Sequence, residues 1–261
     1  MASYQIEAAC CCNMGRRRSN NEDNFCFDNR VLPKDNTGLK HAVTVERKLE
    51  REQYYGVFDG MGGESYGEEA SFLAASVAQD STKVLADFLY PPKKYLTNLV
   101  QKMNKAVCEK SEELHSGRMG STAVMLYFGS GYVYVCNVGD SRAFRLRSGG
   151  FQQISEDHTD AKFLEAQGIK GRKPCLTQHL GIWPEEMVLE PYVAKGELED
   201  GDQYLLCSDG LTDMVDNVEI CAIMKEAPDA RSCAEALVEK ALENGGRDNV
   251  TVIVVRLKEV R

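Results

Sequence analysis

The chain has 261 residues, of which 43% are hydrophobic and 27% charged, and its formal net charge is −9 at pH 7. This acidic balance excludes a general nucleic-acid binder, which needs a basic surface, and the hydrophobic content excludes a largely disordered chain. No apolar run approaches the roughly 20 residues of a membrane helix, so we expect no membrane segment.

The cysteines and the first residues indicate a cellular compartment. The opening stretch MASYQIEAACCCNMG has neither the basic start nor the long apolar core of a secretory signal. Three of the ten cysteines, Cys10, Cys11 and Cys12, are consecutive. Neighbouring residues on a strand point to opposite faces, so these three cannot easily bridge one another. Because no paired CxxC spacing suggests zinc, the pattern predicts reduced thiols in a cytoplasmic protein.

The N-terminal part is expected to form strands and then two helices. Apolar runs predict strands at Tyr4–Cys10, Asn24–Asp28 and Gln53–Phe58. Apolar residues at helical spacing predict a helix over Tyr66–Leu89, ended by Pro91 and Pro92, and a second amphipathic helix that runs to Leu114.

The middle of the chain is rich in strand patterns. The segments STAVMLYF, YVYVCNVG and RAFRLRSG are separated by short Gly/Ser turns, which suits an antiparallel meander. A short helix is then expected over Asp160–Gln167, closed by Gly168. Two more strands are predicted at Met187–Ala194 and Gln203–Cys207.

Two helices and a strand complete the chain. Asp216 and Glu219 form the pattern of a capping box at the start of a helix that Pro228 ends. Another helix is expected over Ala230–Asn244, and the β-branched run NVTVIVVRL predicts a buried central strand. Strands and helices come in clusters and do not alternate strictly, which favours an α+β fold of antiparallel sheets with helices outside them.

Acidic residues recur at the ends of the predicted strands. Asp59 and Asp209 each follow an apolar run and precede a glycine, and Asp248 comes just before the final strand. Glu22 and Asp23 stand just ahead of the strand at Asn24. Neighbouring strands lie about 4.8 Å apart, so carboxylates at several strand ends can converge. Taken singly, each Asp-Gly pair is an ordinary turn, and composition alone does not show that these residues meet in space.

A divalent cation would resolve the repulsion between converging carboxylates. Carboxylate, carbonyl and water oxygens suit Mg²⁺ or Mn²⁺ and suit Zn²⁺ or copper poorly. Gly60 and Gly210 are expected to leave room for waters and for a backbone carbonyl to reach the metal. Two ions bridged by one Asp would create hydroxide from a shared water near neutral pH and would screen the charge of an incoming phosphate.

Seven segments together resemble a known family. The order RRRSNNED, VFDGMGG, GSTAVMLY, NVGDSRAF, LTQHLG, LLCSDGLTDMV and GGRDNVTVIVV closely resembles the metal-dependent protein phosphatases of type 2C, and the DGMGG form is similar to the bacterial branch. The resemblance runs from about Asn13 to Arg256. It implies a four-layer α-β-β-α sandwich with two central antiparallel β-sheets flanked by helices. It also implies hydrolysis of phosphoserine and phosphothreonine in proteins at a centre of two Mn²⁺ or Mg²⁺ ions.

The resemblance carries roles onto individual residues. Asp59 would bridge both ions, the carbonyl of Gly60 would bind one of them, and Asp209 and Asp248 would complete the other. Glu22 and Asp23 would act nearby by holding metal-bound waters. Because these residues form one site, we expect a single catalytic domain over residues 1–261.

Positions 18 and 61 bear on how the phosphate is expected to be bound and how the leaving group is expected to receive a proton. Arg18 matches the phosphate-binding arginine of the family, and its planar fork of donors suits two phosphate oxygens. Met61 stands where the animal branch has a histidine proposed as general acid. His158 is a possible proton donor in its place, although a capping or structural histidine is the plainer interpretation.

Two further departures from the family pattern concern the rim of the site. Many relatives carry an Asp before the GST motif that supports a third metal, whereas Gly117 stands there in this sequence. A third ion bound in the family manner is therefore not expected. The segment Asp160–Thr177 is shorter than the usual flap, which affects substrate selection in a direction that we do not predict.

Several other motifs have structural interpretations. Ser121 and Thr122 lack the base and acid of a nucleophilic triad and begin a central strand. Asp140 and Arg142 are interpreted as a turn with a local ion pair. Trp183 is taken as a packing residue, and Cys207 as a core residue outside any cysteine-phosphatase signature.

The expected partners are phosphoproteins, and the enzyme would act as a monomer that opposes a serine/threonine kinase. One alternative is a regulatory binding module that keeps the fold but has lost catalysis; no core ligand is missing to support it. Another is a metal-dependent hydrolase of small phosphoesters, which the metal chemistry alone does not separate from a protein phosphatase.

Overall fold

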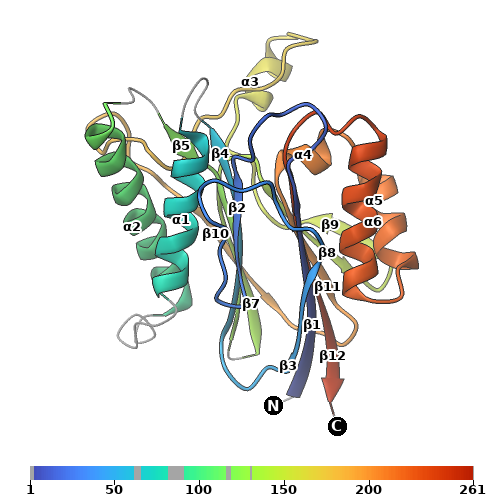
Figure 1. Cartoon of the computed structure of the whole chain (residues 1–261). Helices are drawn as coiled ribbons and strands as arrows, with labels where there is room; N and C mark the ends of the chain where they lie inside the picture. The colour runs from blue at the N-terminus through green and yellow to red at the C-terminus, as the bar shows by residue number, and fades with distance from the viewer. Residues whose placement is uncertain (1–2, 62–65, 82–90, 116–118, 130, 261) are drawn as a thin grey trace.

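Two antiparallel β-sheets lie face to face, and helices cover the outer face of each (Figure 1). The computed structural model describes residues 3–61, 66–81, 91–115, 119–129 and 131–260. The layers follow the order helix, sheet, sheet, helix, which confirms the predicted α-β-β-α sandwich of the α+β class. Within the ranges just given, no helix combines the length and apolar character needed to cross a bilayer.

The first sheet joins the two ends of the chain. Its strands, in spatial order, are β3 (Val43–Lys48), β1 (Ser3–Asn13), β12 (Val250–Val260), β11 (Gln203–Cys207), β8 (Arg142–Arg147) and β9 (Gly150–Gln153). β12 lies in the interior of this sheet between β1 and β11, so the prediction of a buried central strand for NVTVIVVRL is confirmed.

The second sheet contains β4 (Gln53–Met61), whose end borders the candidate site. Its strands, in spatial order, are β10 (Tyr192–Glu197), β7 (Tyr132–Val138), β6 (Ala123–Gly129), β4 and β2 (Asp23–Phe27), and the short β5 (Gly120–Ser121) pairs with the end of β4. The predicted strand from Ser121 is therefore interrupted at Thr122.

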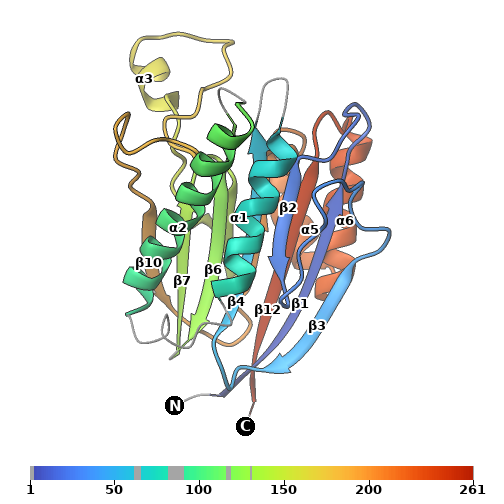
Figure 2. The same ribbon diagram turned by 60° about the vertical axis from the view of Figure 1, so that its left-hand side comes forward.

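Within the described ranges, four helices form the outer layers and two short ones lie elsewhere. α1 (Gly67–Ser81) and α2 (Pro92–Glu113) pack on the second sheet, and α5 (Asn217–Glu226) and α6 (Ala230–Glu243) pack on the first. Figure 2 shows α1 and α2 side by side over β4, β6 and β7. The short helices are α3 (Ala161–Ala166) and α4 (Asp209–Thr212). The predicted extension of the first helix to Leu89 covers residues 82–89, which lie outside the described ranges.

Side chains on the central strands alternate between two cores. On β12, Val250, Val252 and Val254 pack under α5 and α6, whereas Ile253 and Val255 face the second sheet. Because a strand points successive side chains to opposite faces, a strand that is covered on both sides must be apolar almost throughout. This explains the unbroken apolar run in the sequence.

The consecutive cysteines obey the same rule. Cys10 and Cys12 lie in the core between the sheets, and Cys11 lies under the outer helices. All ten cysteines lie within the described ranges, and none of them forms a disulfide there.

The prediction of an antiparallel meander is wrong for its third strand. β6 and β7 pair with each other, but β8 lies in the opposite sheet beside β11 and β9. The crossing begins at Gly139, whose φ of +99° suits glycine and where a Cβ would lie 2.7 Å from the side chain of Thr122. His158 fixes this turn, since its backbone N–H donates to the Gly139 carbonyl at 2.9 Å and its Nδ1 accepts from Gly139 at 3.3 Å. His158 is thus a structural residue.

Three strand assignments were missed or shifted for physical reasons. β3 reads VTVERK and alternates half-buried residues with exposed polar ones, while β9 has only four residues, so neither gives a strong apolar signal. The strand predicted at Met187–Ala194 lies at Tyr192–Glu197 instead. Pro191, which has no N–H to donate, separates β10 from the exposed Val188.

The capping prediction at α5 is half correct. The Asp216 side chain accepts hydrogen bonds from the backbone N–H groups of Val218 and Glu219, both at 2.9 Å, which satisfies two free helix donors. Glu219 does not reach back to Asp216. Its carboxylate pairs with Lys240 of α6 at 3.0 Å and so ties the two outer helices together.

Truncation of the core between the sheets tests this architecture. Leu206 of β11 is fully buried between the sheets, so Leu206→Ala is expected to lower the free energy of unfolding by about 2–5 kcal/mol in a urea titration. Val188→Ala, at a side chain that is 70% exposed, is the control and should change it by less than about 0.5 kcal/mol. Equal effects of the two substitutions would contradict the assignment of the core.

Candidate metal centre

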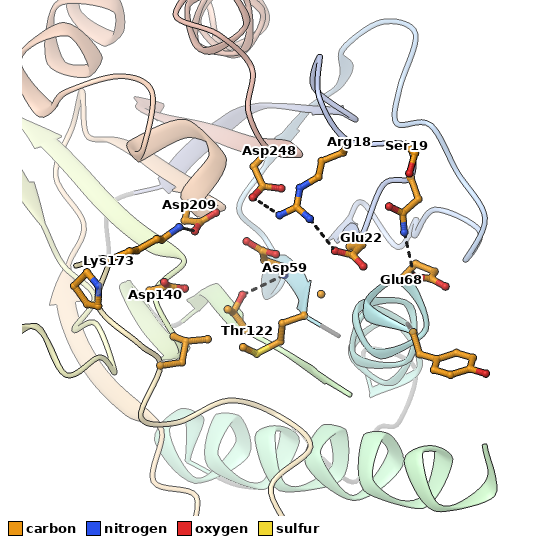
Figure 3. Close-up of a pocket in the computed structure, with 16 residues that line it drawn as sticks. Arg18, Ser19, Glu22, Asp59, Glu68, Thr122, Asp140, Lys173, Asp209 and Asp248 are labelled. Carbon is orange, nitrogen blue, oxygen red and sulfur yellow. Dashed lines mark hydrogen bonds and ion pairs between the residues drawn. The ribbon is translucent and has the colours of Figure 1, made fainter. Parts of the chain in front are cut away.

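One pocket of about 740 Å³ opens at the end of the sandwich where β4 and β11 finish (Figure 3). Figure 1 shows α4, whose first residue lines the pocket, at the end of the sandwich opposite to the chain termini. Six of the seven predicted site residues line it: Arg18, Glu22, Asp59, Gly60, Asp209 and Asp248. The seventh, Asp23, lies beneath it.

Strand ends from both sheets deliver these carboxylates. Asp23 at the start of β2 is the register partner of Asp59 near the end of β4. Asp209 is the first residue of α4 and lies two residues after the end of β11. Asp248 lies two residues before β12, the neighbour of β11. The sandwich therefore brings residues that are far apart in the chain to one rim, as the repeated pattern of carboxylates at strand ends predicts.

Asn249 connects the N-terminal loop to this rim. Its side-chain oxygen accepts from the Glu22 N–H at 2.7 Å, and its side-chain nitrogen donates to the carbonyls of Met14 and Asn20, both at 2.9 Å. Asn249 is almost completely buried. One amide side chain thus fixes the position of the segment that carries Arg18 and Glu22, a role that the sequence did not reveal.

Gly60 and Gly210 serve close backbone packing, and the expectation that they leave open space is wrong. A Cβ on Gly60 would lie 2.0 Å from the Gly67 carbonyl oxygen, where α1 begins. A Cβ on Gly210 would lie 1.9 Å from the carbonyl oxygen of Asn249. Both distances are far below contact distance, so only glycine lets α1 and α4 approach the strand ends this closely.

Asp23 is a buried carboxylate with one oxygen unsatisfied. Its Oδ2 accepts from the Ser208 hydroxyl at 2.7 Å, while Oδ1 has no hydrogen-bond partner among the described residues. Burial raises the pKa of Asp23 to about 7, and the neighbouring charges of Asp209 and Asp248 add to the rise. An orphaned buried carboxylate oxygen is costly unless a cation or a proton satisfies it.

The other carboxylates of the rim are perturbed in the same direction. Burial raises the pKa of Asp59 well above its usual range, and the charges of Asp23 and Asp209 raise it further. Burial likewise raises the pKa values of Glu22 and Asp209, and in Asp209 the ion pair with Lys173 opposes that rise. The fold thus holds several carboxylates close together at the rim although their negative charges repel one another.

Two basic side chains hold carboxylates of the rim. Arg18 donates from Nη2 to Asp248 Oδ2 at 2.6 Å, and its Nη1 lies 3.8 Å from Glu22. Lys173 donates to Asp209 Oδ2 at 2.7 Å on the opposite side of the pocket. Figure 3 shows both contacts pointing into the pocket. Sequence analysis predicted Arg18 but gave no role to Lys173.

Asp140 belongs to the pocket, and its predicted ion pair with Arg142 is wrong. Arg142 pairs with Asp157 through three hydrogen bonds of 2.6–3.2 Å. Asp140 lines the pocket near Asp209, and burial raises its pKa to about 6. The signal was present, because Asp140 also lies just after an apolar strand, although its neighbouring glycine precedes it, whereas Asp59 and Asp209 are each followed by one.

Thr122 positions Asp59 directly. Its hydroxyl oxygen lies 3.1 Å from the Asp59 N–H, which donates to it, and 2.7 Å from the hydroxyl of Ser141. Its own N–H donates to the Asp59 carbonyl at 2.8 Å. The GST motif therefore locks the end of β4 and is not a nucleophile, as expected from its lack of a base.

The departures noted in the sequence have different outcomes. Met61 lines the pocket, whereas Cys207 is buried in the core under the outer helices. Gly117 lies within residues 116–118, outside the described ranges, so the structure does not bear on the expected absence of a third ion.

The donor set fits a hard divalent cation. The acidic pocket residues offer carboxylate oxygens, and Asp23 adds an unsatisfied one, which is the chemistry that Mg²⁺ or Mn²⁺ prefers. In the described part of the chain, no three His, Cys, Asp or Glu side chains are drawn together as a preassembled metal cage. Arg18 and Lys173 hold two of the carboxylates instead, so ion binding requires these side chains to rearrange.

Comparison with known proteins follows the geometry of the site. The family model of protein phosphatase 2C matches residues 12–178 and 171–250. The serine/threonine phosphatase stp of Listeria monocytogenes is 32% identical over 253 residues, which cover 92% of this chain and 92% of the relative. The phosphatase PstP of Mycobacterium tuberculosis is 32% identical over 86% of this chain and 44% of its own length.

Solved structures agree with these sequence relatives. The catalytic domain of PstP, crystallised with two manganese ions, has a TM-score of 0.77 and 28% identity, and the match covers 98% of this chain and all of that domain. The resemblance seen in the sequence, including its bacterial character, is confirmed. The chain belongs to the protein phosphatase 2C family.

Proposed function

We propose that this chain is a protein serine/threonine phosphatase that requires two Mn²⁺ or Mg²⁺ ions held by the rim carboxylates. One observation carries the proposal: Asp59, Asp209 and Asp248, from both sheets, line a single pocket beside Arg18. The enzyme class is that of the relatives, which are named serine/threonine phosphatases and match nearly the whole chain.

The proposed ligands divide between the two ions. Asp59, near the end of β4, would contact both ions, with the Gly60 carbonyl on one, while Asp209 and Asp248 would hold the other. Glu22 and the buried Asp23 would hold water ligands close by. When bound, the ions would supply a hydroxide nucleophile from a shared water and would screen the charge of the phosphate.

The chain's own residues bind and orient the phosphate. Arg18 is 44% exposed at its side chain and points into the pocket, so its guanidinium can offer two parallel donors to a phosphoryl group. Its charge does not titrate near neutral pH. Thr122 holds the backbone of Asp59, because its hydroxyl accepts a hydrogen bond from the Asp59 N–H and its own N–H donates to the Asp59 carbonyl.

The remaining assignments rest on the same site. The residues that line the pocket come from positions between 18 and 248 of one chain. This supports a single catalytic domain over 1–261 that can act as a monomer. Phosphoproteins are the proposed substrates, in opposition to a serine/threonine kinase. The ten cysteines, which form no disulfide in the described ranges, support a reducing location, for which we propose the cytoplasm.

Removal of metal tests the proposal first. Protein treated with a chelator and dialysed should hydrolyse a phosphothreonine peptide at background rate, and added Mn²⁺ should restore turnover. A panel of nucleotides and sugar phosphates, assayed in parallel, should be poor substrates. Equal turnover with and without metal would reject the mechanism, and a preference for small phosphoesters would reject the substrate class.

Substitution of the bridging carboxylate tests the site. Asp59→Asn and Asp209→Asn each remove a charged ligand, so the rate in saturating Mn²⁺ should fall by several orders of magnitude. Asp35→Asn, at an exposed residue away from the pocket, is the matched control and should retain the wild-type rate. Near-normal activity in Asp59→Asn would show that the centre lies elsewhere.

The pH dependence of stability tests the burial of Asp23. Its pKa is raised to about 7 in the folded protein, above the ordinary value near 4 in the unfolded chain, so the folded state binds more protons between these values. The stability of the metal-free protein should therefore fall as pH rises from about 4 to 7. Urea unfolding in the presence of a chelator should show this fall in the wild type and a flatter profile in Asp23→Asn. Identical profiles would contradict the assignment.

A further inference from the structure

Lys173 holds a carboxylate that the proposed metal centre also needs. Its ammonium nitrogen lies 2.7 Å from Asp209 Oδ2 and 2.7 Å from Asp213 Oδ2. Both distances are those of direct charge-assisted hydrogen bonds. Figure 3 shows Lys173 reaching across the pocket wall to Asp209. Lys173 thus binds a carboxylate that is also proposed as a metal ligand.

The segment that carries Lys173 is otherwise held at its base. We call residues 161–175 the rim segment; it includes α3, and residues 165–175 are all exposed. Its ends are closed by Asp160, whose N–H donates to the Cys175 carbonyl at 2.9 Å and whose carboxylate accepts from Cys175 at 2.7 Å. Lys162 and Arg172 pair with Glu156 and Asp160, near the same base. Lys173 is the residue whose hydrogen bonds and ion pairs attach the segment to α4.

A metal ion at Asp209 and the Lys173 ammonium repel each other. A divalent cation would add two positive charges beside a carboxylate whose Oδ2 already accepts from an ammonium group, and charges only a few ångströms apart interact strongly near a protein surface. A contact that forms only in the absence of the ion lowers the affinity for the ion, because ion binding must break that contact. The loss in binding free energy equals the free energy of the broken contact.

We propose that Lys173 competes with the metal ion for Asp209. It binds Asp209 when no ion is bound and so lowers the affinity for Mn²⁺. When the ion binds, Lys173 dissociates from α4. The inference rests on the proposed metal centre. Metal occupancy then controls whether Lys173 attaches the rim segment to α4. The rim segment is therefore proposed as a regulatory element beside the pocket.

Calorimetric titration of Mn²⁺ into chelator-treated protein tests the competition. Lys173→Met should bind Mn²⁺ about three- to tenfold more tightly than the wild type, the size expected when two partly exposed ion pairs no longer oppose binding. Lys173→Arg keeps a positive charge and should stay close to the wild type. Lys170→Met removes the same charge from the same exposed segment and is the matched control, for which no change is expected.

The outcomes separate this inference from the proposed function. If the wild type binds no Mn²⁺, both are overturned. If the wild type binds Mn²⁺ and Lys173→Met binds it equally or more weakly, only the competitor role is overturned. An equal gain in Lys170→Met would reduce the effect to general charge and would also overturn it.

Limited trypsin digestion gives a second readout that does not depend on affinity. Cleavage after Lys170 or Arg172 can be followed in every variant, since Lys173 precedes Pro174 and trypsin does not cut that bond. Mn²⁺ should accelerate cleavage of the wild type, and Lys173→Met should be cleaved rapidly with or without the ion. Cleavage of the wild type at one rate in both conditions would contradict the release of the segment.

Discussion

Repulsion among carboxylates at one rim of the sandwich is the constraint on which the rest of this structure depends. Asp23 and Asp59 are register partners on adjacent strands, and Asp209 stands close enough to raise the pKa of both. Folding must bring these groups together against their charge and their loss of water. In the structure the compensation comes from Arg18 and Lys173, and one oxygen of Asp23 has no hydrogen-bond partner among the described residues.

The scaffold keeps this unfavourable arrangement in place. Pairing of β2 with β4 and of β11 with β12 sets the register, and a slip of one residue between β2 and β4 would turn Asp23 or Asp59 to the other face of the sheet. Gly60 and Gly210 allow helices to begin against the strand ends, and Asn249 anchors the loop before β2. Rigid strands therefore present a set of oxygens that repel one another, and such a set favours a multivalent cation over any side chain.

Much of this could be predicted from the sequence because the signals are local. An apolar strand that ends in a carboxylate is visible in the letters, and the series of motifs identified both the family and six residues of the pocket. Contacts that depend on the crossing of the chain were not visible: β8 changes sheets at Gly139, so Arg142 meets Asp157 and leaves Asp140 facing the pocket. Lys173 was missed because an exposed lysine carries no periodic signal, and only folding brings it to Asp209.

The central claim is that oxygens from both sheets share a pair of divalent ions. A crystal structure of the protein in manganese, with ions located by their anomalous scattering, tests it most directly. The account predicts two ions in the pocket, with the Asp59 carboxylate touching both and Asp209 and Asp248 at direct ligand distance from one of them. Ions bound elsewhere, or carboxylates of residues 59, 209 and 248 that contact no common ion cluster, would contradict it.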